Sequence, residues 1–321
     1  MAKRAARDRF VVRPEEGQLT LADIDPGKTK GIRKPEAKAE RSRDLARLLE
    51  LQTRLYAENT RSLLLVLQGM DTSGKDGTIT HVIGGINPLG VRITGFKAPT
   101  DEERKHDFLW RIRKVLPQPG EIAIFNRSHY EDVLIARVKN LVPPSVWQKR
   151  YDEINRFEEQ VTAAGTTIVK VCLHISFDEQ RKRLLSRLLT PEKRWKFNPN
   201  DLEERSRWPE YQTAYDAALF RCSIRAAPWY VVPADKKWYR NWAVTRMLIE
   251  TLEEMDPRYP QRELDITHLA RQLAAPDAFA DKNENTDGAA SERPASDAPA
   301  RRRRPIAARR RPAARHHRKP A

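Results

Sequence analysis

The 321-residue sequence has few cysteines and no long apolar run. Its two cysteines, Cys172 and Cys222, lie far apart and lack metal-ligand spacing, so we expect neither a disulfide framework nor a thiolate metal site. No apolar run approaches the ~18 residues that a membrane-spanning helix needs. The first ten residues, MAKRAARDRF, contain no apolar core, so we expect no secretory signal. These absences favour a soluble, cytoplasmic protein with no membrane partner.

Acidic residues are missing from one stretch, residues 301–321, which contains ten Lys and Arg residues and accounts for most of the formal net charge of +16. From about residue 276, Ala, Pro, Arg, Asp and Ser dominate and no apolar periodicity remains, so the sequence predicts a disordered basic tail over 276–321. Such a tail binds polyanions by releasing counterions and reads no base sequence. A nucleic-acid-binding protein is therefore one alternative function.

The most informative stretch is LLLVLQGMDTSGKDGT, residues 63–78. Its apolar start predicts a buried strand, which is followed by the pattern G-x-x-x-x-G-K from Gly69 to Lys75 and by a segment that can form a helix. Backbone N–H groups, a helix N-terminus and a lysine together bind phosphate, so this order favours a phosphate-binding loop over a plain glycine turn. The expected phosphate-binding residues here are Gly69, Ser73, Gly74, Lys75, Asp76 and Gly77.

Two carboxylates belong to this loop. Asp76 stands where the usual motif has a Ser or Thr that holds Mg²⁺, and Asp71 lies inside the loop. Carboxylates beside a triphosphate repel it unless a metal ion lies between them. The sequence therefore predicts Mg²⁺ as the cofactor, with Mn²⁺ as a substitute.

Apolar strands alternate with helical patterns along the chain, which predicts βαβ units and hence an α/β fold with a five-stranded parallel sheet covered on both faces. Residues 1–34 are expected to be irregular. The apolar stripe in the helix at 36–60 favours packing on the core over an oligomer contact. We expect strands at 63–67, 91–96, 121–125, 166–175 and 229–232, and helices at 36–60, 75–84, 101–116, 145–164, 178–189, 201–222 and 239–255.

A polar cluster, Asn126 to Asp132, follows the third predicted strand. In phosphate-loop enzymes a carboxylate at the end of a neighbouring strand holds Mg²⁺ or its water, whereas here the first polar residue is Asn126. Arg127 suits phosphate oxygens because its planar guanidinium binds them bidentately. His129 is expected to be a hydrogen-bonding residue and not a catalyst.

A second basic group runs from Arg181 to Lys196 and continues past Pro191. A solvated helix flank is the ordinary explanation for such a run. Its place directly after a strand end favours instead a cationic lid, about residues 178–205, that closes over phosphates. The phosphate-binding candidates outside the loop are Lys97, Arg127, Arg183, Arg187 and Arg194.

Together these residues resemble the polyphosphate kinase 2 family over about residues 8–260. The matching stretches are QGMDTSGKDGTI at 68–79, FKAPTDEERKHDFLWR at 96–111, FNRSHYEDVL at 125–134, RWKFNPNDLEER at 194–205 and APWYVVPADKKWYRN at 227–241. The FNRSHYEDV version resembles the class III subgroup, which is associated with phosphorylation of both AMP and ADP. Other classes have Asp at the position of Asn126, so the metal is expected at Asp71, Glu131 or Asp132.

The resemblance implies a thymidylate-kinase-like P-loop fold, a three-layer sandwich with a helical lid, whose kinase domain spans 35–275. It implies Mg²⁺-dependent, in-line phosphoryl transfer between inorganic polyphosphate and a nucleotide, from ADP to ATP and also from AMP to ADP. Catalytic roles fall on Asp71, Lys75 and Arg127, and the chain is expected to form a homo-oligomer, a dimer or a tetramer. An ATP-dependent P-loop kinase acting on a small molecule is the nearest alternative.

Overall fold

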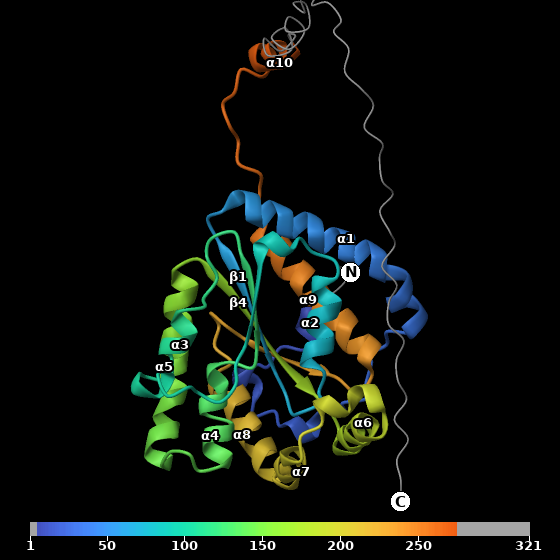
Figure 1. Cartoon of the computed structure of the whole chain (residues 1–321), viewed down its shortest axis with the longest axis vertical. Helices are drawn as coiled ribbons and strands as arrows, with labels where there is room; N and C mark the ends of the chain where they lie inside the picture. Colours follow the sequence, from blue (N-terminus) through green and yellow to red (C-terminus); the bar gives the residue numbers. More distant parts are fainter. Residues whose placement is uncertain (1–4, 275–321) are drawn as a thin grey trace, which may run out of the picture. The chain divides into compact units, whose positions relative to one another are not determined.

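The computed structural model describes residues 5–274, which belong to two compact units divided after Gln261. In the second unit the described part contains one helix, α10 (Ile266–Ala274). The predicted tail at 276–321 lies outside the described residues. The first unit is built on the predicted sheet (Figure 1).

Five parallel strands form this sheet in the order β2-β3-β1-β4-β5. All seven residues of the central strand β1 are buried, as the apolar run predicted. Leu67 of β1 pairs with Asn126 of β3 and with Val171 of β4, so the carboxyl ends of three strands meet at one edge. The predicted α/β fold is confirmed. The strands are β1 Ser62–Gln68, β2 Val91–Gly95, β3 Ile122–Asn126, β4 Thr166–His174 and β5 Trp229–Pro233.

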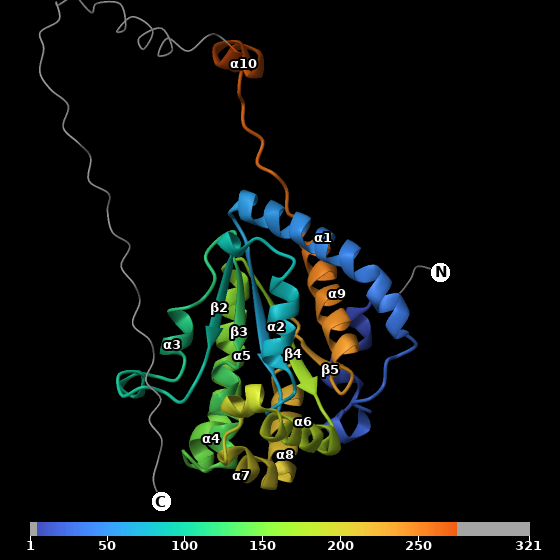
Figure 2. The same cartoon turned by 45° about the vertical axis from the view of Figure 1, so that its right-hand side comes forward.

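Helices cover both faces of the sheet (Figure 2). Because side chains alternate along a strand, Leu63 and Leu65 of β1 enter one apolar cluster while Leu64 and Val66 enter the other. The first cluster contains α1 (Lys34–Glu58), α2 (Lys75–Ile83) and α9 (Lys237–Met255). The second contains α4 (Ile135–Val138), α5 (Pro144–Ala163) and α8 (Trp208–Arg221).

The carboxyl edge of the sheet carries the predicted lid segment, which contains α6 (Phe177–Leu189), the 3₁₀ helix η7 (Pro191–Lys196) and α7 (Asn200–Ser206) (Figure 2). The helix predicted over 201–222 is in fact two helices, α7 and α8. Pro209 lies in the first turn of α8, where its missing N–H costs nothing, and it would disrupt a continuous helix.

The prediction of one helix over 101–116 was wrong. Only the 3₁₀ helix η5 (Glu103–Lys105) and the short α3 (Trp110–Arg113) form there. Thr100 does cap the first turn, since its Oγ1 accepts a hydrogen bond from the Glu103 N–H at 3.2 Å. The Asp107 carboxylate then accepts from the Leu109 N–H at 3.0 Å. This side-chain hydrogen bond takes the place of a helical backbone hydrogen bond at Leu109, so the first helix ends and α3 begins as a separate helix.

The N-terminal segment, expected to be irregular, contains three 3₁₀ helices and packs on the edge strand β5. The Val12 N–H donates to the Trp229 carbonyl at 2.8 Å, and Val11 forms an isolated antiparallel bridge with Tyr230. Phe10, Val12 and Leu21 are buried. These contacts cover an edge that would otherwise be open to pairing with another chain. The 3₁₀ helices are η1 (Arg7–Arg9), η2 (Pro14–Glu16) and η3 (Leu21–Asp23).

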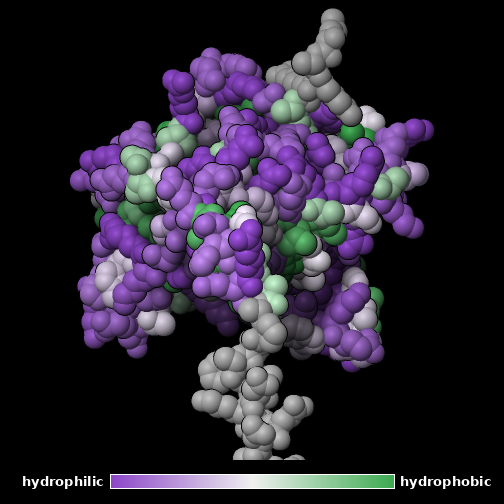
Figure 3. All heavy atoms as spheres, turned by 90° about the horizontal axis from the view of Figure 1, so that it is seen from above, coloured by the Kyte–Doolittle hydropathy of each residue, from purple (hydrophilic) through white to green (hydrophobic). Residues whose placement is uncertain are grey.

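The face drawn in Figure 3 is mostly hydrophilic, and its apolar residues lie in small separate patches. Within residues 5–274, no helix combines the length and the apolar character needed to cross a membrane.

Candidate active site

The predicted phosphate loop connects β1 to α2 at the carboxyl edge of the sheet. Two of its glycines have positive φ angles, 145° at Gly69 and 106° at Gly74. A Cβ at Gly69 would lie 2.6 Å from the Leu173 carbonyl oxygen, and one at Gly74 would overlap the Arg240 guanidinium. Glycine is required at both positions because these φ angles strain any residue with a Cβ, and at Gly69 the fixed Leu173 carbonyl also leaves no room for one. Thr72 also has a positive φ angle, 66°, which is strained for a β-branched residue.

Lys75, the first residue of α2, lies beneath this loop. Its ammonium group is buried and donates to the Gly69 carbonyl oxygen at 2.6 Å. Burial, together with the nearby Arg127 guanidinium, lowers the pKa of Lys75. The buried hydroxyls of Thr72 and Ser73 have no hydrogen-bond partner within the described part of the chain. The loop therefore offers one buried cation and two unsatisfied hydroxyls, groups that bind phosphate oxygens.

Arg127 faces the loop from the end of β3. Its φ angle of 65° turns the chain sharply after the strand, and its Nη2 donates to Asp71 Oδ1 at 2.9 Å. Burial alone would raise the pKa of Asp71, but Lys75 and Arg127 outweigh it and the net pKa is lowered. Burial would likewise lower the pKa of Arg127, but Glu131 and Asp71 outweigh it and the pKa is raised. Both side chains are therefore charged at neutral pH.

Asn126 and Asp76 meet on the other side of the loop. The Asn126 Nδ2 donates to Asp76 Oδ1 at 2.8 Å. An aspartate at position 126 would place two carboxylates together, whereas the amide binds the carboxylate directly. Asp76 is thus held at the start of α2 with its second oxygen free of any hydrogen bond to the described residues.

These groups open into a cavity of about 750 Å³ at the carboxyl edge of the sheet. Its walls come from the phosphate loop, the ends of β2 and β3, the segment α6–η7 and the first turn of α9. Ten Lys and Arg side chains line it against three acidic ones. The cations are Lys75, Lys97, Arg127, Lys182, Arg183, Arg187, Lys193, Lys196, Lys237 and Arg240, and the acids are Asp71, Asp76 and Glu179. A cavity of this charge binds a polyanion with several phosphate groups.

The profile of the polyphosphate kinase 2 family matches residues 31–260. The chain belongs to the polyphosphate kinase 2 family. It is 52% identical to the AMP/ADP-polyphosphate phosphotransferase of Meiothermus ruber over 257 residues, which are 79% of this chain and 96% of that protein. It is 45% identical to the ADP-polyphosphate phosphotransferase of Rhodopseudomonas palustris over 243 residues, 71% of this chain and 84% of the relative.

A solved structure of polyphosphate kinase 2 from Arthrobacter aurescens TC1 superposes with a TM-score of 0.78 at 45% identity, over 83% of this chain and 98% of the other. The family resemblance noted in the sequence is therefore confirmed, and so is the predicted class of fold.

In this polyphosphate kinase 2 chain, the cavity brings together most of the residues that the sequence selected. Those that line it are Asp71, Gly74, Lys75, Asp76, Gly77, Lys97, Arg127, Arg183 and Arg187. Gly69 and Ser73 lie in the same loop but do not line the cavity, and Arg194 is exposed with its Nε donating to the Leu188 carbonyl at 2.9 Å.

The two further metal candidates lie behind Arg127. Glu131 is 4.0 Å from the Arg127 guanidinium. Asp132 accepts from Arg150 at 3.0 Å and lies 4.0 Å from Arg111, so its carboxylate is already paired with two guanidinium groups. Burial raises the pKa of Asp132. Neither side chain lines the cavity.

Arg183 lines the cavity, but its guanidinium is bound to the protein at every donor. Its Nη1 donates to the carbonyl oxygens of Thr72 and Ser73 at 2.9 and 3.1 Å, and Nη2 donates to those of Ala234 and Asp235 at 2.7 and 2.8 Å. The fifth donor, Nε, binds Glu179 at 2.9 Å. This arginine therefore ties α6 and the end of β5 to the phosphate loop.

Sequence reasoning did not select Lys237 and Arg240, which reach the cavity from the first turn of α9. The Arg240 Nη1 donates to the Ser73 carbonyl at 3.2 Å. Burial, and secondly the nearby Arg183, lower the pKa of Arg240 to about 10. The signal for both residues was their position just after the fifth strand, since ligands bind beyond the carboxyl ends of parallel strands. Lys182, Lys193 and Lys196 belonged to the basic run but were not singled out.

His129 forms part of a buried network behind the site. Its Nε2 lies 3.2 Å from Glu158 Oε1, to which the Tyr130 hydroxyl also donates at 3.0 Å. Lys170, which is fully buried, donates to Glu158, to the Tyr130 hydroxyl and to the Cys222 carbonyl. The prediction that His129 makes hydrogen bonds is consistent with this arrangement. The network fixes the backbone that follows Arg127.

The described residues contain no group of three or more His, Cys, Asp or Glu side chains placed to hold a metal ion. Mg²⁺ seldom needs such a cage, because it usually binds one or two carboxylates together with substrate phosphates and water. Asp71 and Asp76 both line the cavity beside the phosphate loop. This pair of carboxylates is suited to a metal ion that arrives with a phosphate chain.

Proposed function

We propose that this chain transfers phosphoryl groups between inorganic polyphosphate and nucleotides, converting ADP to ATP and also AMP to ADP. Membership of the polyphosphate kinase 2 family supports the reaction class. The observation that carries the proposal is the cavity in which a phosphate loop, Lys75 and Arg127 meet eight further cations, because a polymeric anion needs such an extended positive surface. The relatives named above support AMP and ADP as acceptors.

The proposed chemistry is an in-line displacement on a terminal phosphoryl group. The attacking oxygen of ADP or AMP is already anionic, so no strong general base is required and catalysis is mainly positioning and charge neutralisation. Lys75 and the loop N–H groups hold the transferring phosphate, and Arg127 neutralises charge that builds up on its oxygens. Asp71 orients Arg127 through their 2.9 Å hydrogen bond.

We further propose Mg²⁺ as the metal, with Mn²⁺ as a substitute, held by Asp71 and Asp76 together with substrate phosphates. When bound, the metal ion would offset the repulsion between the two carboxylates and the negatively charged phosphates. Glu131 is better suited to orienting Arg127, which it approaches to 4.0 Å. Asp132 is less suited to metal binding because its carboxylate is paired with Arg150 and lies 4.0 Å from Arg111.

The segment 178–205 is proposed to act as the lid. Lys182, Arg187, Lys193 and Lys196 line the cavity from this segment, while Arg183 fixes its base to the phosphate loop. Closure of such a segment would bring cations over the phosphates and exclude water. The phosphate-binding role predicted for Arg183 thus becomes a positioning role, and Arg194 stays a prediction.

The direct test incubates the purified protein with polyphosphate, Mg²⁺ and either ADP or AMP, and resolves the nucleotides by chromatography. We expect ATP from ADP, and ADP followed by ATP from AMP, with both products lost in Lys75→Ala. Lys105→Ala is the matched control, because Lys105 lies on the exposed 3₁₀ helix η5. Turnover without polyphosphate, with ATP as the donor, would instead support a small-molecule kinase.

Two further expectations concern assembly and the tail. We propose a homo-oligomer, a dimer or a tetramer, which sedimentation analysis of the full chain would measure. Deletion of residues 276–321 is expected to leave turnover largely intact and to weaken the salt-sensitive binding of polyanions. A deletion that abolishes turnover would mean that the ten basic residues help to hold the polymer, and nucleic-acid binding without turnover would favour the alternative function.

A further inference from the structure

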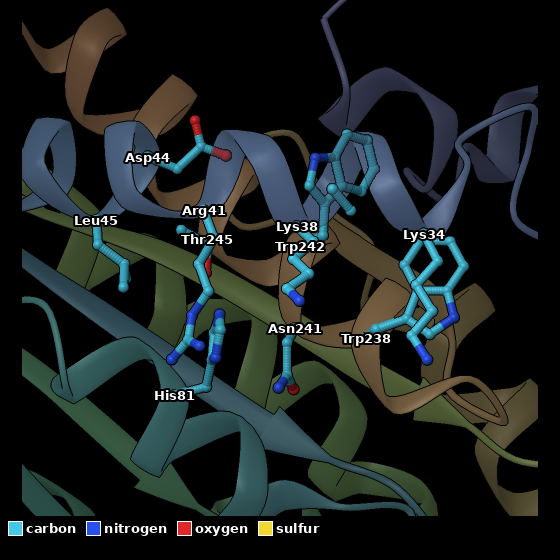
Figure 4. A pocket seen from close by; sticks show the side chains of 11 residues that line it. Lys34, Lys38, Arg41, Asp44, Leu45, His81, Trp238, Asn241, Trp242 and Thr245 are labelled. Carbon is cyan, nitrogen blue, oxygen red and sulfur yellow. The ribbon is translucent and has the colours of Figure 1, made fainter.

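A second cavity, of about 280 Å³, lies between α1, α2 and α9 (Figure 4). It is separated from the phosphate cavity by the first turns of α9. Lys237 and Arg240 line the phosphate cavity, whereas Trp238 and Trp242 line the second one, and no residue is common to both. Nothing in the proposed reaction uses this second cavity.

One wall of the second cavity carries three cations from α1. Lys34, Lys38 and Arg41 are spaced by four and three residues, so they lie on one face of the helix. No hydrogen bond or ion pair links the side chain of any of the three to another residue in the range 5–274. The acidic residue at this cavity, Asp44, is already bound by Arg246 at 3.1 Å. An anion entering here would therefore find three unpaired cations.

The opposite wall is aromatic and contains a buried hydroxyl. Trp238 is half-buried, and Trp242 is fixed by a hydrogen bond from its Nε1 to Glu40 at 3.1 Å. Thr245 is 2% exposed, and its Oγ1 has no hydrogen-bond partner among the described residues. A buried hydroxyl without a partner costs free energy that a ligand would recover. His81 adds an imidazole beside Arg41 (Figure 4).

We propose that this cavity is an accessory binding site for a nucleoside monophosphate. Its base packs against Trp238, and its phosphate binds Lys38 and Arg41. Aromatic side chains stack on bases of any sequence, and cations hold the phosphate, so both halves of the ligand find matching walls. Polyphosphate alone matches less well because it has no apolar surface for the indole. The volume, just below the ~300 Å³ of the smaller ligand pockets, limits the ligand to about one base, one sugar and one phosphate.

The test is a calorimetric titration of the full-length protein with AMP in the absence of polyphosphate, so that no phosphoryl donor is present. We expect two AMP sites per chain, one at the phosphate cavity and one here. Arg41→Glu should weaken one of the two sites by at least about tenfold and leave the other unchanged. Arg43→Glu is the matched control, because Arg43 is an exposed arginine on the same helix that does not line the cavity, and it should retain both sites.

A second variant separates the base from the phosphate. Trp238→Ala should weaken the accessory AMP site by about tenfold and leave the binding of inorganic phosphate unaltered. AMP binding that Arg41→Glu leaves unchanged, whether one site or two are seen, or equal effects of Arg41→Glu and Arg43→Glu, would overturn the proposal. So would phosphate binding as tight as AMP binding together with no effect of Trp238→Ala. Loss of a site in Arg41→Glu is measured without turnover and reports on this cavity alone, so failure here is distinguishable from failure of the proposed phosphotransfer.

Discussion

Replacement of Glu158 by Gln would test how the buried network supports the active site. Glu158 is fully buried and accepts hydrogen bonds from Tyr130 and Lys170, and its other neighbour is His129. The substitution keeps the shape of the side chain but removes the charge that faces the Lys170 ammonium. Breaking a buried ion pair from one side typically costs ~3–5 kcal/mol, because it leaves the other charge uncompensated.

The structure favours the lower end of that range. Lys170 keeps two other acceptors in the variant, the Tyr130 hydroxyl at 2.8 Å and the Cys222 carbonyl at 2.7 Å. We therefore expect Glu158→Gln to lower the free energy of unfolding by ~3 kcal/mol. For a domain of this size, 1 kcal/mol corresponds to ~2–4 °C, so Tm should fall by ~6–12 °C. Turnover should also fall, since the network fixes the backbone just after Arg127.

Urea denaturation and thermal unfolding would measure the loss, with Glu159→Gln as the control. Glu159 is the neighbouring residue on α5 and is exposed, so its loss of charge should change stability by less than ~0.5 kcal/mol. A Glu158→Gln protein within 1 kcal/mol of the natural one would refute the reasoning. It would mean that the Lys170–Glu158 pair contributes nothing beyond an uncharged hydrogen bond.

The loss of stability in the same variant should depend on pH. Burial would raise the pKa of Glu158, but Lys170 and His129 outweigh it, and the net pKa lies below the ordinary value of 4.5. A carboxyl with a lowered pKa stabilises the fold above its unfolded-state pKa, and that contribution is lost as the pH falls through the folded-state pKa. The stability gap between the natural protein and Glu158→Gln should therefore be largest near neutral pH and shrink below about pH 4.5.

Four shorter predictions concern the phosphate cavity. Lys75→Met should lower kcat by ~10²–10³-fold in the chromatographic assay, as does loss of a donor that stabilises a transition state, and near-normal turnover would contradict its role. Gly74→Ala should lower turnover strongly, because a φ angle of 106° is strained for any side chain and the new Cβ displaces the Arg240 guanidinium; a fully active variant would mean that the loop can shift. Asn126→Asp should lower the half-saturating Mg²⁺ concentration severalfold in a metal titration, since an added carboxylate ~4 Å away attracts a cation by at least ~1 kcal/mol. A rise in the half-saturating Mg²⁺ concentration would contradict metal binding at Asp76. Arg183→Lys should lower Tm measurably, because one ammonium cannot replace five directed donors, whereas an unchanged Tm would remove its positioning role.

The sequence determined the core of the site because that information is local. A buried strand, a glycine loop and a helix are adjacent in the chain, so the spacing of Gly69, Gly74 and Lys75 was enough to predict a phosphate loop. Parallel strands with one common carboxyl edge also explain why Arg127 and Lys97, each just past a strand, reach the same cavity. The stretches that carry the family resemblance include these same residues, and the family profile matches residues 31–260.

Helix boundaries were harder to predict, because a single side-chain hydrogen bond to the backbone can end a helix that the composition favours. The stretch at 101–116 has an N-cap, acidic residues in its first turn and basic residues in its last. The Asp107 carboxylate nevertheless accepts a hydrogen bond from the Leu109 N–H, and a separate helix begins there. Pro209 could have been recognised in the sequence as the start of a second helix, since proline is favoured in a first helical turn.

The partner of each charged side chain depends on how the chain packs in three dimensions. Arg183 and Arg187 look equivalent in the sequence, because they are four residues apart on one helix. In the structure the guanidinium of Arg183 donates only to other groups of the protein. The sequence predicts Asp132 as a metal ligand but not the Arg150 guanidinium that donates to its Oδ1. Arg240 reaches the phosphate loop from 167 residues away. Such partners are distant in sequence, and packing alone brings them within hydrogen-bond reach.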